Sequence, residues 1–256
     1  MTFPGVAREP AERLPLPVKR AGENVPAVLW RPASTPPTAI VLVGHGGGMD
    51  KDSPFVARFA GHLAGNFGCA VVAIDAPHHG ERTPAGERGL SALVRRERMG
   101  LSAWRERNSQ ATAQAVADWQ AAIDAVQGLD AVPDVPVGYF GVSMGTRFGI
   151  PLAAAEPRIT AAVFGLFGHP AGDGASAFAR AARQVTIPVL FLLQWDDRLF
   201  SREDGLSLFD LLGSRRKTLH ANPGGHLQIP PAEAIAAVQF LHQHLAPDSP
   251  APATSR

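Results

Sequence analysis

Short apolar runs that alternate with helical stretches constrain the fold of this chain more than any other feature. Each run is nearly continuous in apolar or β-favouring residues, which is typical of strands that are buried on both faces. The runs lie at 39–43, 70–74, 137–140, 161–166, 189–193 and 217–219. Helical candidates lie at 54–65, 108–127, 146–155, 175–184, 202–212 and 231–245. This alternation predicts an α/β fold in which a mostly parallel, twisted sheet is covered by helices on both faces.

The two ends of the chain depart from this pattern. Two earlier runs, 14–19 and 25–30, are joined by Ala21-Gly22-Glu23-Asn24, which predicts an antiparallel N-terminal hairpin. Residues 1–13 and the Pro/Ala/Ser-rich tail 247–256 are expected to be disordered. Because 256 residues suit one large sheet, we expect residues 14–246 to form a single domain.

The composition excludes several classes of partner. The chain has 24 Lys and Arg residues against 23 Asp and Glu residues, a formal net charge of +1. This balance offers no basic footprint for nucleic acid or for an anionic membrane, so the expected partner is a small molecule. Cys69 is the only cysteine, which excludes an intrachain disulfide and a multi-cysteine metal site. With neither a signal-peptide pattern nor an apolar run of about 18 residues, the expected location is the cytoplasm.

A glycine-flanked serine provides the most informative short motif. Gly141-Val142-Ser143-Met144-Gly145 lies directly after the apolar run 137–140 and directly before the helical stretch that starts at 146. This strand–turn–helix context is typical of a nucleophile elbow, in which a strained turn directs the serine hydroxyl outward. The alternative is a tight turn without chemistry. The sequence favours Ser143 as a nucleophile.

Other polar residues follow the ends of the predicted strands, where ligands bind in sheets of this kind. After the run 39–43 comes His45-Gly46-Gly47-Gly48, whose backbone amides can approach a ligand closely. We expect the amide of Gly47 or Gly46, together with that of Met144, to form an oxyanion hole. His45 is expected to shape this loop rather than to transfer protons. The alternative is a flexible turn that does not contact substrate.

Two adjacent carboxylates and one histidine complete a candidate triad. Asp196 and Asp197 follow the run 189–193, and His226 lies in a glycine-rich loop after the last run. Neighbouring side chains point in different directions, so one carboxylate would reach the histidine, and Asp197 is preferred over Asp196. Asp173 remains as a third candidate. The chain order Ser143, Asp197, His226 is the nucleophile, acid, base order of one known triad arrangement.

Three further features carry open interpretations. Asp75, His78 and His79 could be imagined as metal ligands, but their spacing matches no known metal motif, so no metal and no cofactor is expected. The arginine-rich stretch 81–107 is either a lid or a solvated helix face. Four aromatic residues are candidate walls of a substrate pocket: Trp104, Phe167, Trp195 and Phe200.

Over about residues 14–246 the chain resembles the α/β-hydrolases, and within them the dienelactone-hydrolase-like esterases. The motifs that carry the resemblance are His45-Gly46-Gly47, Asp75-x-Pro77-x-His79-Gly80, Gly141-x-Ser143-x-Gly145, Asp197 and Gly225-His226. Two departures stand out. Gln194 occupies a position where the family often has glycine, and Ser143 replaces the cysteine nucleophile of dienelactone hydrolases, which argues against dienelactone as substrate.

The resemblance and the candidate triad together imply a serine hydrolase that cleaves a small to medium carboxylic ester through an acyl-enzyme intermediate. An acyltransferase, a thioesterase or a peptidase could use the same triad, so these activities remain alternatives. A non-catalytic binding protein on this fold would usually have lost one member of the triad.

Overall fold

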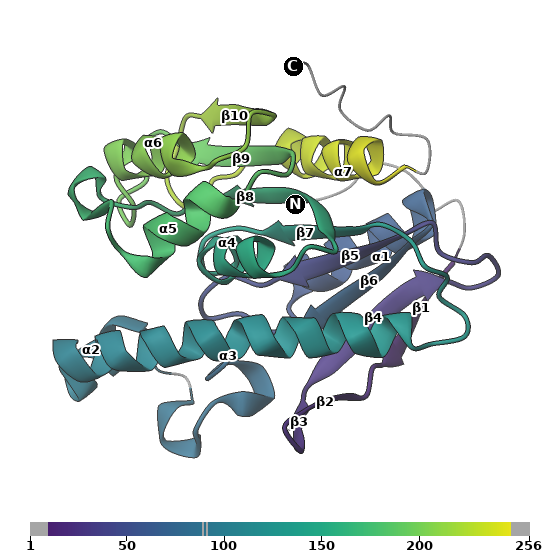
Figure 1. Cartoon of the computed structure of the whole chain (residues 1–256). Helices are drawn as coiled ribbons and strands as arrows, with labels where there is room; N and C mark the ends of the chain where they lie inside the picture. The colour runs from purple at the N-terminus through teal and green to yellow at the C-terminus, as the bar shows by residue number, and fades with distance from the viewer. Residues whose placement is uncertain (1–9, 89, 91, 247–256) are drawn as a thin grey trace.

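A computed structural model describes residues 10–88, 90 and 92–246 (Figure 1). Within these residues an eight-stranded sheet has the order β1-β4-β6-β5-β7-β8-β9-β10. The strands, in chain order, are β1 (Ala11–Pro15), β4 (Ala27–Pro32), β5 (Ala39–Gly44), β6 (Cys69–Ile74), β7 (Val137–Gly141), β8 (Ile159–Gly165), β9 (Val189–Gln194) and β10 (Lys217–Asn222). From β6 to β10 every neighbouring pair is parallel, whereas β4 and β1 are antiparallel additions at one edge. The predicted α/β fold is confirmed.

Alternate residues of the central strands are buried in two separate cores, one on each face of the sheet. In β5, Ile40 and Leu42 belong to one core, and Val41 and Val43 belong to the other. The first core is shared with α3 (Leu101–Gln127), α4 (Met144–Ala155), α5 (Ala177–Gln184) and α6 (Arg202–Leu211). The second is shared with α1 (Pro54–Phe67) and α7 (Pro231–Leu245). Burial on both faces explains why these strands read as continuous apolar runs.

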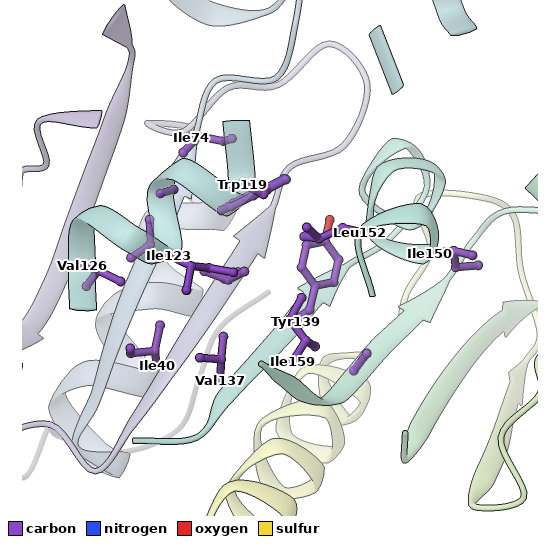
Figure 2. Close-up of a cluster of buried hydrophobic side chains, with 14 of the residues drawn as sticks. Ile40, Ile74, Trp119, Ile123, Val126, Val137, Tyr139, Ile150, Leu152 and Ile159 are labelled. Atoms are coloured by element: carbon purple, nitrogen blue, oxygen red, sulfur yellow. The ribbon is translucent and has the colours of Figure 1, made fainter. Parts of the chain in front are cut away.

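Large side chains from the central strands and from α3 and α4 meet in the first core (Figure 2). Trp119 and Ile123 of α3 lie over Tyr139 of β7, with the Trp119 and Tyr139 ring centroids 6.0 Å apart in an edge-to-face arrangement. Tyr139 is fully buried, and its hydroxyl donates a hydrogen bond to the carbonyl oxygen of Gly145 at 2.7 Å. The core therefore supports the turn in which Ser143 lies.

The predicted antiparallel N-terminal hairpin is confirmed, but its strands are shorter than predicted, and the residues on either side of it form two further strands. β1 pairs with β4 in the main sheet, and β2 (Val18–Arg20) pairs with β3 (Glu23–Val25) in a separate two-stranded ribbon. Pro17 and Pro26 lie between the β1–β4 pairing and the β2–β3 pairing. They interrupt the backbone hydrogen bonds there because proline has no N–H to donate. β1 begins at Ala11, so residues 11–13 form part of a strand and were wrongly expected to be disordered. The same expectation for 1–9 and 247–256 lies outside the described residues.

The stretch 81–107 is largely helical. It contains the short 3₁₀ turns η1 (Gly80–Arg82) and η2 (Ala85–Glu87), then α2 (Ala92–Met99) and the first turns of α3, which starts at Leu101 rather than at 108. This stretch is rich in arginine and glutamate, so it lacks the hydrophobic periodicity that would have indicated these helices. The C-terminal end of α3 leads into the start of β7. The N-terminal half of α3 therefore lies on the side of the sheet where the parallel strands have their carboxyl ends, next to α2 (Figure 1).

In the described part of the chain, no helix has the length and apolar character needed to cross a membrane.

Candidate active site

Ser143 lies in the sharp turn between β7 and α4, with φ 57° and ψ −119°. This positive φ is strained for a residue that has a side chain. The neighbouring glycines make the turn possible. A Cβ on Gly145 would lie 2.8 Å from the carbonyl oxygen of Gly44, and a Cβ on Gly141 would lie 2.9 Å from the carbonyl carbon of Gly145. Strand, loop and helix therefore approach closely only because both positions lack side chains.

Hydrogen bonds hold the strained turn in place. The backbone N–H of Ser143 donates to the carbonyl oxygen of Gly165 at 2.8 Å. The fully buried hydroxyl of Thr146 accepts from the N–H of Gly165 at 2.8 Å and lies 2.8 Å from the carbonyl oxygen of Gly141, to which it can donate. These bonds join the ends of β7 and β8 to the first turn of α4. The serine hydroxyl is thereby held in one direction.

His226 and Asp197 come to Ser143 from the loops that follow β10 and β9. The Nε2 atom of His226 is 3.0 Å from Oγ of Ser143, and its Nδ1 atom is 2.6 Å from Oδ2 of Asp197. The Asp197 side chain is only 3% exposed, and its Oδ1 accepts hydrogen bonds from the N–H groups of Leu199 at 2.7 Å and Phe200 at 3.3 Å. A carboxylate at Oδ2 accepts the Nδ1 proton, which leaves the Nε2 lone pair facing the serine hydroxyl.

The two other candidate carboxylates have different partners. Asp196 is exposed, and its Oδ2 accepts from the N–H of Gly224 at 2.9 Å, so it links the β9 loop to the histidine loop. Asp173 lies beside His169, whose Nε2 is 2.9 Å from the Asp173 carbonyl oxygen. Of the three carboxylates considered from the sequence, the structure brings Asp197 to His226.

The glycine-rich loop after β5 lies against the serine turn. The Cβ position of Gly145 is 2.8 Å from the Gly44 carbonyl oxygen and 3.6 Å from that of His45. His45 is buried, and both of its ring nitrogens contact backbone: Nδ1 is 2.9 Å from the Gly46 carbonyl oxygen, and Nε2 accepts from the N–H of Ala76 at 3.0 Å. Burial lowers the pKa of His45. This residue shapes the loop, as the sequence indicates.

The candidates for the oxyanion hole are backbone amides of the serine turn and of the glycine-rich loop after β5. Met144 is the first residue of α4, where a backbone N–H has no partner within the helix and adds to the positive end of the helix dipole. Gly47 has no atom within 4 Å of its Cβ position, and Gly46 meets only the sulfur of Met49 at 3.5 Å. The predicted oxyanion-hole residues therefore belong to two adjoining segments, and no backbone atom crowds the Cβ position of either loop glycine.

A buried ion-pair cluster that the sequence does not reveal fixes the glycine-rich loop. Asp75 is fully buried, and its Oδ1 accepts from the backbone N–H of Lys51 at 2.9 Å. Its Oδ2 accepts from the N–H of Glu81 at 2.9 Å and from Nζ of Lys51 at 3.3 Å. Burial alone would lower the pKa of Lys51, but the carboxylates of Glu81, Asp52 and Asp75 raise it above the ordinary value. The cluster connects the loop after β5 to the loop after β6.

The same contacts argue against a metal site at Asp75, His78 and His79. Both oxygens of Asp75 already accept hydrogen bonds, and Nδ1 of His79 is 2.9 Å from the Pro77 carbonyl oxygen. Burial lowers the pKa of His79 to about 4. Across residues 10–88, 90 and 92–246, no group of three or more His, Cys, Asp or Glu side chains is arranged to hold a metal ion.

Two of the four predicted pocket residues lie beside the triad. The ring centroids of Phe200 and His226 are 5.8 Å apart, and those of Phe167 and Phe200 are 4.6 Å apart. Trp195 is 45% exposed, with the Arg202 guanidinium 4.3 Å above its ring. Trp104 lies in the first turn of α3 and is partly exposed.

A separate cleft lies elsewhere on the molecule. Its volume is about 480 Å³, and its lining includes Arg13, Lys51, Asp52 and Glu81 but none of the three triad residues. The ion pairs between these side chains account for its charged wall. It is therefore a separate feature from the candidate active site.

Comparison with known proteins identifies relatives among solved structures. No family model matches the chain, and no curated protein sequence matches it. A PEG-bound, cold-adapted esterase from an Arctic intertidal metagenomic library is 37% identical over 96% of this chain and 100% of its own, with a TM-score of 0.74. A native structure of a cold-adapted esterase from the same kind of library is 34% identical over the same shares, with a TM-score of 0.71.

A dienelactone hydrolase from Anabaena variabilis is 22% identical over 93% of this chain and 100% of its own, with a TM-score of 0.68, and supports the fold alone. The sequence identity to the first of these esterases extends over nearly the whole of both chains. The sheet order and the turn at Ser143 agree with an α/β-hydrolase fold. The chain therefore belongs to the same family as these cold-adapted esterases, and its fold is that of the α/β-hydrolases.

Proposed function

We propose that this protein hydrolyses small to medium carboxylic esters through an acyl-enzyme intermediate on Ser143. The observation that carries the proposal is the continuous chain of hydrogen bonds from Ser143 Oγ through His226 to Asp197, at 3.0 Å and 2.6 Å. A serine hydroxyl is a weak nucleophile unless a neighbouring base takes its proton, and His226 is within reach to do so.

The reaction proceeds in two steps. Ser143 Oγ attacks the acyl carbonyl while His226 Nε2 accepts the hydroxyl proton, and Asp197 stabilises the imidazolium that forms. The N–H groups of Met144 and of Gly47 or Gly46 stabilise the negative oxygen of the tetrahedral intermediate. His226 then returns the proton to the departing alkoxide, which leaves as the alcohol.

Water completes the cycle. His226 accepts a proton from a water molecule as its oxygen attacks the acyl carbon, and the proton is then returned to Ser143 as the carboxylic acid leaves. Phe200 and Phe167 provide an apolar wall beside His226, which suits the hydrocarbon part of an ester. The segment 81–107 is either a lid over this site or a solvated helix face.

Steady-state hydrolysis of a panel of nitrophenyl esters of increasing acyl length, with matched thioesters and aminoacyl amides, tests the proposal. We expect the esters to give the highest kcat/KM and Ser143→Ala to abolish turnover of all of them. Ser109→Ala, which alters an exposed serine on α3, is the matched control and should keep full activity. Better turnover of thioesters or amides would favour a thioesterase or a peptidase.

Product analysis separates hydrolysis from acyl transfer. With added alcohol, a hydrolase yields mainly the carboxylic acid, whereas an acyltransferase yields mainly the new ester. If no member of the panel is turned over by the wild-type protein, the proposed esterase activity is wrong for these substrate classes.

A further inference from the structure

Gln194, the last residue of β9, is 1% exposed and lies against the loop that carries His226. Its Nε2 atom is 2.8 Å from the carbonyl oxygen of Gln228, 3.4 Å from that of Gly225 and 3.5 Å from that of Pro223. Two of these carbonyl groups precede His226 in the chain and one follows it. One buried amide therefore contacts the histidine loop on both sides of the imidazole.

The chemistry of this contact makes Gln194 a connector. A glutamine amide has two N–H bonds. The short contact to Gln228 takes one of them, and the two longer contacts share the other. Three carbonyl oxygens that converge on one point repel each other unless a donor lies between them. Removing the donor would let the loop open.

Other contacts restrain mainly the first half of the loop. Asp196 exchanges two hydrogen bonds with Gly224, at 2.9 Å and 3.1 Å. The N–H of Gly225 donates to Oε1 of Gln228 at 2.6 Å, a bond within the loop itself. The contact from Gln194 to Gln228 adds a connection between β9 and the half of the loop that follows His226.

The stability of the fold does not explain a glutamine here. Oε1 of Gln194 is buried and finds no hydrogen-bond partner among the described residues, and the same is true of Nδ2 of Asn222. Asn222 is in register with Gln194 on the neighbouring strand β10. Burying unpaired amide atoms lowers stability, so a residue chosen for packing alone would be apolar.

We propose that Gln194 is a positioning residue. It holds the His226 loop in the position from which the imidazole contacts both Ser143 and Asp197. The inference rests on the proposed function of the triad. Because the two triad contacts are 3.0 Å and 2.6 Å long, a small displacement of the loop weakens both together. Proton transfer from Ser143 to His226 would slow, while the aromatic wall beside the substrate would change little.

Gln194→Met tests this role, because methionine is similar in volume but has no N–H donor. We expect kcat for a short-chain nitrophenyl ester to fall about 10- to 100-fold, the effect of misplacing a reacting group by roughly 1 Å, while KM changes less than about threefold. Phe191→Leu, a buried change on the same strand away from the loop, is the matched control and should lower the melting temperature without lowering kcat.

A spectroscopic measurement makes the test independent of substrate. The proton between His226 Nδ1 and Asp197 should give a strongly downfield proton resonance in wild type and in Phe191→Leu, and this resonance should shift or broaden in Gln194→Met. If Gln194→Met does not fold, Gln194→Leu, which also lacks an N–H donor, should show the same two changes.

The outcomes separate this inference from the proposed function. A wild-type protein without esterase activity contradicts the proposed function, and the resonance then decides the role of Gln194. An unchanged kcat, an unchanged resonance, or an equal loss of kcat in Phe191→Leu overturns the role of Gln194 even if the enzyme is an active esterase.

Discussion

Replacing Asp197 by asparagine should invert the proton arrangement of His226 while leaving the fold intact. Oδ1 of Asp197 accepts hydrogen bonds from the N–H groups of Leu199 and Phe200, and Oδ2 faces Nδ1 of His226 at 2.6 Å. In Asp197→Asn, the amide oxygen would stay with the two N–H donors, which turns the NH₂ group towards the imidazole. Nδ1 would then have to accept, so the proton would sit on Nε2, and His226 could no longer take a proton from Ser143.

The expected loss follows from this inverted tautomer. An aspartate-to-asparagine change in a serine triad lowers kcat by about 10⁴-fold, which corresponds to about 5.4 kcal/mol of transition-state stabilisation at 1.36 kcal/mol per tenfold. Initial rates with a nitrophenyl ester and an active-site titration would measure it. Circular dichroism and the melting temperature should stay close to those of wild type.

Asp196→Asn is the matched control on the neighbouring residue. Asp196 is exposed, and asparagine retains an oxygen that can accept from the N–H of Gly224. We expect kcat to stay within about twofold of wild type, because surface changes of this kind alter free energies by about 0.5 kcal/mol or less. An Asp197→Asn variant that keeps more than about a tenth of wild-type kcat would refute the tautomer argument. Loss of activity in Asp196→Asn alone would assign the acid to that residue instead.

Three further predictions concern the surroundings of the site. Lys51→Met should lower the free energy of unfolding in urea by about 3 kcal/mol, because it leaves the buried carboxylate of Asp75 without its cation; Lys19→Met, which alters an exposed lysine, should not. Burial holds the pKa of His79 at about 4, below the unfolded value of about 6.5, so the unfolded state binds more protons and stability falls as pH drops through this interval. The melting temperature of His79→Gln should therefore fall less than that of wild type between about pH 7 and pH 5, and an equal fall would contradict this. Chelators should leave kcat unchanged, and a loss that zinc restores would show that a metal site was missed.

The strands were predictable because burial on both faces leaves a local mark in the sequence. The apolar runs 39–43 and 189–193 correspond closely to β5 and β9. The N-terminal ribbon was not predictable in detail, because the pairing of β1 with β4 depends on a long-range choice of partner that the prolines at 17 and 26 only constrain. The start of α3 was also missed, because charged residues on a partly exposed helix carry little apolar period.

The candidate site was predictable in its main residues for a similar reason. Ser143, Asp197 and His226 each follow a strand end, and parallel strands bring such residues to one edge of the sheet. The supporting contacts could not be predicted. Gln194 meets Gln228, and Lys51 meets Asp75, only because loops from different strands fold against each other. Asp75 even resembled a possible metal ligand, whereas the structure pairs it with a lysine.

Labelling with a serine-directed fluorophosphonate tests the central claim most directly. The reagent forms a stable adduct with a serine that an adjacent base has activated. We expect peptide mass spectrometry to show a single adduct on the peptide that contains Ser143, with esterase activity lost in proportion to the labelled fraction. An adduct on another residue with none at Ser143, or full activity after complete labelling of Ser143, would contradict the account.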